Sequence, residues 1–282
     1  MTEPKRILFV SQEIFPYLDE ETPMRLRNRQ LPEYFQARGF ETRTFMPKFG
    51  EINERRNQLH EVIRLSGINI IIADADHPLL IKVASVQSAR IQIYFIDNDD
   101  YFQQRLMKLD ENGVEYNDND ERAIFYARGV LETVKKLRWC PDIIHCQGWM
   151  SALVPLYIKK AYQDEPSFRD SKVIFSLFDE EFQSTLSENI TEKILLKGIN
   201  KADVEILDKP SATFEDLCKL AISYSDGIIQ SSEHVNEDML NYAREKGIPV
   251  LEYQSPETYA DAFNNFYDEI WSQGKEMIEE EE

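Results

Sequence analysis

The chain has 282 residues, of which 51 are Asp or Glu and 32 are Lys or Arg, so its formal charge is −19. This surplus argues against nucleic acid as a partner, because phosphate contacts need a face rich in Lys and Arg. With 42% hydrophobic and 11% aromatic residues, the composition is that of a folded globular protein. Disordered and fibrous classes are therefore excluded.

The cysteines and the apolar runs bear on the compartment. Cys140 and Cys146 are six residues apart with no second pair, and an odd total of three indicates free thiols rather than a disulfide framework or a metal site. The apolar run from Ile7 to Val10 is too short for a secretion signal, and no stretch reaches the ~18 apolar residues of a membrane helix. We expect a soluble cytoplasmic protein with no membrane partner, metal or cofactor.

Short apolar runs rich in β-branched residues alternate with helical patterns along the chain. This rhythm predicts an α/β fold with a mostly parallel sheet and flanking helices. One amphipathic helix is expected from Ala123 to Leu137, directly before a strand. The predicted strands are Ile7 to Val10, Thr42 to Met46, Ile91 to Ile96, Ile143 to Cys146, Val173 to Leu177, Gly227 to Gln230 and Pro249 to Glu252.

Two segments interrupt this alternation. Between Leu59 and Ile96, short apolar runs broken by turn residues predict β-hairpins inserted into the α/β frame. The stretch from Asp179 to Ser211 is polar, and we expect a long excursion there with one helix near Thr191 to Lys197.

The last helix is expected to begin near Ser255 and Pro256, which suit a helix cap and a first turn. One face of it carries an aromatic stripe: Tyr259, Phe263, Phe266, Tyr267, Ile270 and Trp271. We favour a helix that closes one edge of the core, and a partner-binding face is the alternative. The whole pattern predicts one domain over residues 4–273 and an acidic tail over residues 274–282.

Five ordered blocks in the first 160 residues carry a family resemblance. They are Ile7 to Tyr17; Leu31-Pro32 with Ala37 to Glu41 and Phe45 to Gly50; Tyr94 to Asn98; Tyr116 to Arg122; and Trp139 to Cys146 with Ala152 to Tyr157. Together they resemble the amino-terminal half of bacterial glycogen and starch synthases. That resemblance implies a GT-B glycosyltransferase, in which two Rossmann-like halves extend an α-1,4-glucan from a nucleotide-glucose donor. Only the acceptor-side half is matched, so we expect a single GT-B amino-terminal half.

The loop after the first strand departs from the family. The family has a Lys-x-Gly-Gly-Leu motif there, in which glycines let backbone N–H groups approach a diphosphate. This chain has Leu18-Asp19-Glu20-Glu21-Thr22-Pro23-Met24, without glycine or lysine. We therefore expect a solvated acidic loop that repels a diphosphate.

Two further motifs have lost their polar residues. Where the family has His-x-His-Asp-Trp-His-x-Ala, this chain runs from His145 to Ala152, with Gln147, Gly148 and Met150 in place of two histidines and the aspartate. Phe178 stands where the family has another histidine. Because glutamine, glycine and methionine cannot shuttle a proton near neutral pH, no catalytic residue is expected.

The remaining family positions form a candidate glucan-binding set: Asp118, Asn119, Arg122, His145 and Trp149. The first three precede a helix and are equally consistent with a helix cap and a sugar ligand. For His145 and Trp149 a structural role in the core is the more frequent one, although a tryptophan can stack on a sugar. All five are expected near the carboxyl ends of the strands, where open α/β sheets bind ligands.

These observations lead to three hypotheses. The leading one is a glycogen/starch-synthase-like domain, catalytically inactive alone, that binds an α-glucan weakly or binds a partner protein. The alternative is an active α-1,4-glucan glucosyltransferase whose donor-binding half comes from another chain or from a homo-oligomer. The third is a purely structural or regulatory interaction protein without a sugar site.

Overall fold

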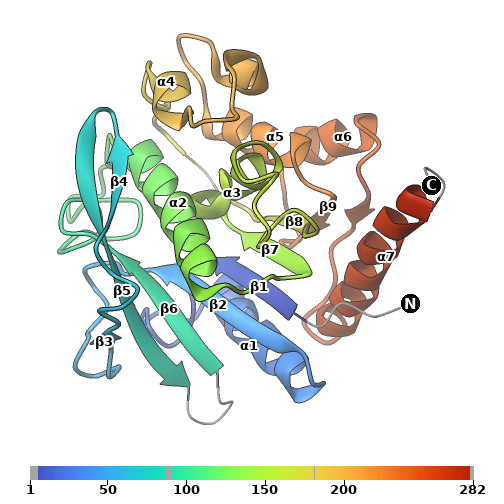
Figure 1. Ribbon diagram of the computed structural model, residues 1–282, viewed down its shortest axis with the longest axis horizontal. Coiled ribbons are helices and arrows are strands. Elements are labelled where there is room, and N and C mark those ends of the chain that lie inside the picture. The colour runs from blue at the N-terminus through green and yellow to red at the C-terminus, as the bar shows by residue number, and fades with distance from the viewer. Residues whose placement is uncertain (1–5, 87–90, 181, 280–282) are drawn as a thin grey trace.

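The protein forms a wound α/β sheet in the computed structural model, which describes residues 6–86, 91–180 and 182–279 (Figure 1). The strand order is β10-β9-β8-β7-β1-β2-β6-β5-β3, and β4 pairs with β5. Pairing is parallel from β10 to β6 and antiparallel among β6, β5, β4 and β3. The strands are β1 (Arg6–Ser11), β2 (Glu41–Pro47), β3 (His60–Glu61), β4 (Ile68–Ile72), β5 (Ala75–Val86), β6 (Ile91–Asp97), β7 (Ile143–Gln147), β8 (Lys172–Leu177), β9 (Gly227–Gln230) and β10 (Val250–Leu251).

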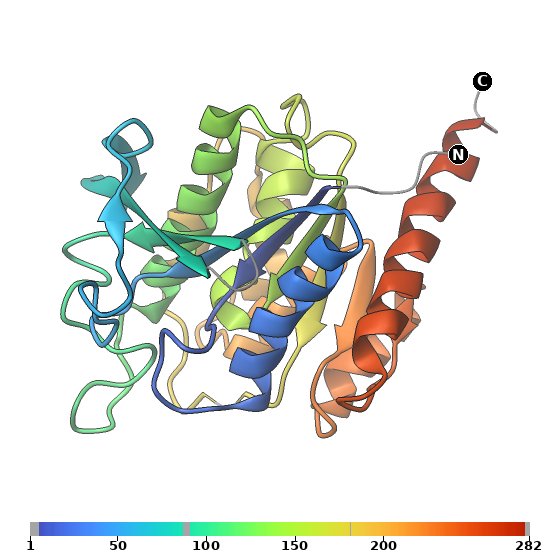
Figure 2. The same cartoon turned by 90° about the horizontal axis from the view of Figure 1, so that it is seen from below.

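Helices cover both faces of this sheet (Figure 2). The described helices are α1 (Pro23–Ala37), α2 (Asn119–Leu137), α3 (Val154–Leu156), α4 (Ile190–Ile194), α5 (Phe214–Ser223), α6 (Glu237–Glu245) and α7 (Tyr259–Glu279). Helices α1 and α7 pack on one face, where Phe35 stacks on Tyr267. Helices α2, α3, α5 and α6 pack on the other face, and the central strands are therefore buried on both sides.

The expected fold class is confirmed, and all seven predicted strands are present. The hairpins predicted between Leu59 and Ile96 are present: β3, β4 and β6 each pair antiparallel with β5. The helix predicted near Thr191 to Lys197 is present as α4, which ends at Ile194, and the excursion from Asp179 also contains a 3₁₀ segment at Lys201–Leu207 that was not predicted.

The last helix closes one face of the core, which is the alternative that the sequence favours. Phe263 and Tyr267 are fully buried against the strands and α1. The expected boundary at residue 273 falls inside α7, which continues to Glu279, and residues 280–282 lie outside the described part.

Candidate ligand-binding cleft

A cleft of ≈ 470 Å³ opens at the carboxyl ends of the parallel strands. Strand β1 has β2 on one side and β7 on the other. The chain first adds strands on the β2 side of β1 and later adds strands on the β7 side, so the strand order reverses at the boundary between β1 and β7. Open α/β sheets bind ligands at such a boundary. The lining residues are Gln12, Glu13, Thr22, Pro23, Met24, Met107, Lys108, Trp149, Phe178, Asp179, Glu180, Ser232, Glu233 and His234.

Glu180 is the most perturbed acid in this cleft. Its Oε1 accepts from Gln12 Nε2 at 2.8 Å, and its Oε2 accepts from the backbone N–H of Trp149 at 3.2 Å. Burial raises the pKa of Glu180 to about 7, because the charged carboxylate is desolvated there. Near neutral pH this carboxyl therefore exists in both protonation states.

The wall formed by the loop after β1 is acidic. Asp19, Glu20 and Glu21 are exposed, as the sequence predicts for a solvated acidic loop, and α1 begins directly after Thr22. The Thr22 hydroxyl accepts from the backbone N–H of Arg25 at 3.2 Å. The Thr22 cap takes one N–H at the helix start, where an anion would need free donors, and the loop before it carries three exposed carboxylates.

A second acid on this wall is Glu13, whose Oε2 accepts from Arg25 Nε at 2.6 Å. Burial raises the pKa of Glu13, while the Arg25 guanidinium opposes that rise. Arg25 also donates to the carbonyl oxygen of Glu20 at 2.8 Å, so this cation is used to hold the loop.

Trp149 is the one member of the predicted glucan-binding set that lines the large cleft. Its ring is 2% exposed and makes edge contacts with Phe182 and Phe214. Trp149 and Asn119 also line a second hollow of ≈ 20 Å³, a volume that suits one water molecule and not a sugar.

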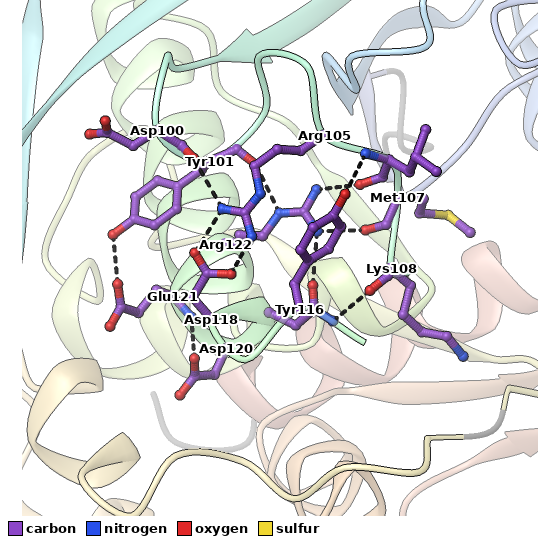
Figure 3. A network of polar contacts seen from close by, with 12 residues as sticks. Asp100, Tyr101, Arg105, Met107, Lys108, Tyr116, Asp118, Asp120, Glu121 and Arg122 are labelled. Atoms are coloured by element: carbon purple, nitrogen blue, oxygen red, sulfur yellow. Dashed lines mark hydrogen bonds and ion pairs between the residues drawn. The ribbon is translucent and has the colours of Figure 1, made fainter. Parts of the chain in front are cut away.

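Asp118 holds the loop that precedes α2 (Figure 3), and Asn119, the first residue of α2, bonds to the same loop. The Asp118 carboxylate forms a two-pronged ion pair with Arg105, at 2.5 and 2.7 Å, and it makes no side-chain cap on α2. Asn119 donates to the Lys108 carbonyl oxygen at 3.1 Å and accepts from Arg122 at 2.8 Å. These contacts position Lys108, which lines the cleft.

Arg122 is fully buried and acts as the centre of the same network (Figure 3). Its guanidinium donates to the carbonyl oxygens of Tyr101, Met107 and Leu106 at 2.7 to 2.9 Å. Burial, with the nearby Arg105, lowers the pKa of Arg122 to about 10, so the group is still charged near neutral pH. This placement gives Arg122 a structural role in the loop rather than contact with a ligand in the cleft.

His145 lies inside the core, beneath α7. It is 0% exposed, with Nε2 2.6 Å from Ser176 Oγ and Nδ1 2.6 Å from Tyr267 OH. Burial, with a smaller effect of Arg27, lowers the pKa of His145 to about 3. A neutral histidine held between two hydroxyls is out of reach of a ligand in the cleft, and this favours the structural alternative.

Gln147, Gly148 and Met150, the three positions that differ from the family motif, are also buried. Gln147 Oε1 accepts from Ser11 Oγ at 2.6 Å, and Met150 is 0% exposed. Gly148 has φ +86°, and a Cβ added there would lie 2.5 Å from Gln12 Oε1. The neighbourhood is therefore packed around these particular residues.

Gln12, Glu13 and Glu180 line the cleft but were not predicted from the sequence. All three lie within three residues of the end of β1 or β8, so the rule that ligands bind at carboxyl ends was a usable signal for them. Within the part of the chain that the structure describes, no His, Cys, Asp and Glu side chains gather as a metal site. In the same part, no helix has the length and apolar character to cross a membrane.

Comparison with known proteins gives a consistent family. The family model described as "Starch synthase catalytic domain" matches residues 6–251. A protein named glycogen synthase from Pelodictyon phaeoclathratiforme is 35% identical over 198 residues, covering 70% of this chain and 40% of that protein. The glycogen synthase of Chlorobaculum tepidum is 32% identical over 238 residues, covering 74% and 49%.

A solved structure shows the same fold. The catalytic domain of Starch Synthase IV from Arabidopsis thaliana, bound to ADP and acarbose, superposes with a TM-score of 0.69 at 16% identity. The match covers 90% of this chain and 52% of that one. The chain thus spans less than half the length of the two curated relatives named above. The resemblance seen in the sequence is confirmed, and the chain belongs to the starch synthase catalytic domain family, within the GT-B glycogen and starch synthases.

Proposed function

We propose that this domain binds an α-glucan in the cleft at the carboxyl ends of β1, β7 and β8, and does not transfer glucose by itself. The observation that carries the proposal is the lining of the cleft. It combines carboxyl and amide groups with the apolar surfaces of Met24, Met107 and Phe178. Such a surface suits a neutral, hydroxyl-rich chain that has polar edges and apolar faces.

The same lining disfavours a nucleotide-sugar donor. Glu13, Asp179, Glu180 and Glu233 line the cleft, whereas the cationic side chain there is Lys108, with His234 beside it. A diphosphate needs backbone N–H groups and positive charge, and the loop before α1 presents exposed carboxylates instead.

The relatives support the glucan as ligand class. The two relatives named above are called glycogen synthase, and the solved structure is described as bound to ADP and acarbose. For this domain by itself, with its cleft open to water, we expect a dissociation constant of about 1 mM for maltoheptaose, or roughly −4 kcal/mol.

The test is a titration with maltoheptaose by NMR, on the wild type and two proline variants. Pro23 is exposed at the start of α1 and lines the cleft, so Pro23→Trp fills it and should abolish binding. Pro166 is exposed in the turn before β8, at the opposite end of the strands, so Pro166→Trp should bind as the wild type does. Absence of binding in the wild type, or equal binding by both variants, would contradict the proposal.

A second measurement addresses catalysis. Purified protein should release no nucleotide from ADP-glucose or UDP-glucose in the presence of glycogen. Turnover by the purified chain would establish the glucosyltransferase alternative, and turnover only after cell extract is added would point to a donor half supplied by another chain.

A further inference from the structure

We propose that Glu180 makes ligand binding in the cleft proton-dependent, so that a neutral glucan binds the protonated carboxyl and ionisation of Glu180 weakens binding. This inference rests on the proposed function. It assigns Glu180 as the residue that sets both the ligand class and the pH response of the same site.

Two hydrogen bonds fix the carboxyl of Glu180, and their donors follow the neighbouring strands β1 and β7. Gln12, after β1, donates to one oxygen at 2.8 Å, and the backbone N–H of Trp149, after β7, donates to the other at 3.2 Å. Gln12 is itself oriented, since its Oε1 accepts from the backbone N–H of Met150 at 3.3 Å. Glu180 therefore has a defined position at the junction of β1, β7 and β8.

The charges around Glu180 come from every neighbouring element. Glu13 follows β1, Asp179 follows β8, and Glu233 and His234 follow β9, while Lys108 comes from the loop before α2. Behind the cleft, burial raises the pKa of the Cys218 thiol on α5, and Glu180 adds to that rise. Desolvation and the nearby Glu13 raise the pKa of Glu180, whereas Lys108 and the hydrogen bonds from Gln12 and Trp149 oppose that rise.

The two hydrogen bonds from the protein favour the charged form of Glu180, so the direction of the effect is set by burial and by what the ligand does to the carboxyl. Both protein partners of Glu180 are donors, so the O–H of the protonated carboxyl has an open role as a donor. A hydroxyl or ether oxygen of a glucan accepts that hydrogen bond. A bound glucan also displaces the water that hydrates the carboxylate, and this penalises the charged form. By linkage, glucan binding then takes up a proton.

The experiment is calorimetric titration of the wild type with maltoheptaose at pH 6 and pH 8, in two buffers with different ionisation enthalpies. Since burial raises the pKa of Glu180 to about 7, we expect three- to tenfold weaker binding at pH 8, and net proton uptake at pH 7. The proton uptake is measured on the wild type and does not depend on a variant that folds.

Three variants locate the effect. Glu180→Gln cannot ionise, so the binding that it retains should be equal at both pH values and without proton uptake. Glu233→Gln removes another carboxylate of the cleft and should keep the pH dependence. His234→Gln is required because histidines change charge between pH 5 and 8, and it should also keep the pH dependence.

Each other outcome overturns the inference. Equal wild-type affinity at pH 6 and pH 8, or a pH dependence that survives in Glu180→Gln, rejects the role of Glu180 and leaves glucan binding standing. Loss of the pH dependence in His234→Gln would assign that dependence to His234 and not to Glu180. If maltoheptaose binds at neither pH, the proposed function fails, and this inference fails with it.

Discussion

At the scale of single residues, His145 shows how burial changes the meaning of a motif position. Burial lowers the pKa of His145 to about 3, against about 6.5 for a free histidine. Between these two pH values His145 is protonated in the unfolded chain and neutral in the folded protein. The free energy of unfolding therefore falls as the pH is lowered from about 6.5 toward 3, by about 1.4 kcal/mol per pH unit from this residue.

This dependence can be measured by urea denaturation between pH 4 and pH 7. His145→Gln should be less stable than the wild type at pH 7, and its stability should fall less steeply toward pH 4. The control is His60→Gln, which changes an exposed histidine and should keep the wild-type slope. Parallel curves for wild type and His145→Gln would contradict the assignment.

Gly148 and Met150 provide a second test at this scale. Gly148→Asp with Met150→His restores the residue types of the family motif, yet φ at Gly148 is +86° and a Cβ there meets the Gln12 side chain at 2.5 Å. We expect the double variant to lose about 1–3 kcal/mol of stability from backbone strain, and to show no glucosyl transfer to glycogen. Transfer above the background of a mock purification would show that the chemistry is recoverable.

At the scale of elements, the loop between β6 and α2 depends on Arg122. Arg122→Met removes four hydrogen bonds and leaves the carbonyl oxygens of Tyr101, Leu106 and Met107 without this partner. We expect a loss of at least about 3 kcal/mol in thermal or urea unfolding, together with faster proteolysis of the loop. Arg169→Met is the matched control, because Arg169 is an exposed arginine and its removal should change stability by about 0.5 kcal/mol or less. Equal stability of the two variants would disprove the role of Arg122.

The elements also show how far the sequence can be interpreted. Buried parallel strands are continuous apolar runs, and for that reason β1, β7 and β8 were predictable. Helix α1 was missed because its buried face includes Arg25, Arg27 and Asn28, so its apolar periodicity is weak.

The candidate site was less predictable, because its polar contacts join distant segments. The donors of Arg122 are taken by carbonyl groups 15 to 21 residues away along the chain, which no local pattern displays. The same holds for Glu180 and Gln12, which are 168 residues apart. Family motifs directed attention to Asp118 and His145, whereas residues next to the strand ends line the cleft.

At the scale of the whole molecule, a net charge of −19 combines with the local charge of the cleft. The negative charge does not repel a neutral glucan, whereas it repels an anionic ligand that approaches the cleft. Because salt screens such repulsion within about 8–10 Å, the local carboxylates matter more than the total charge. Two separate obstacles thus oppose a nucleotide diphosphate: repulsion, and the missing glycines in the loop before α1.

These obstacles can be separated with ADP-glucose. Calorimetric titration of the wild type should be silent, since the Thr22 cap and the exposed Asp19, Glu20 and Glu21 replace a phosphate cradle. The triple variant Asp19→Ser, Glu20→Ser, Glu21→Ser removes the loop's share of the repulsion and leaves the loop without glycine, so it should be silent as well. Binding by the triple variant alone would show that charge is the only barrier. A micromolar dissociation constant for the wild type, about −8 kcal/mol, would show that the cleft accepts the donor and that the domain is an enzyme half rather than a glucan-binding relative of one.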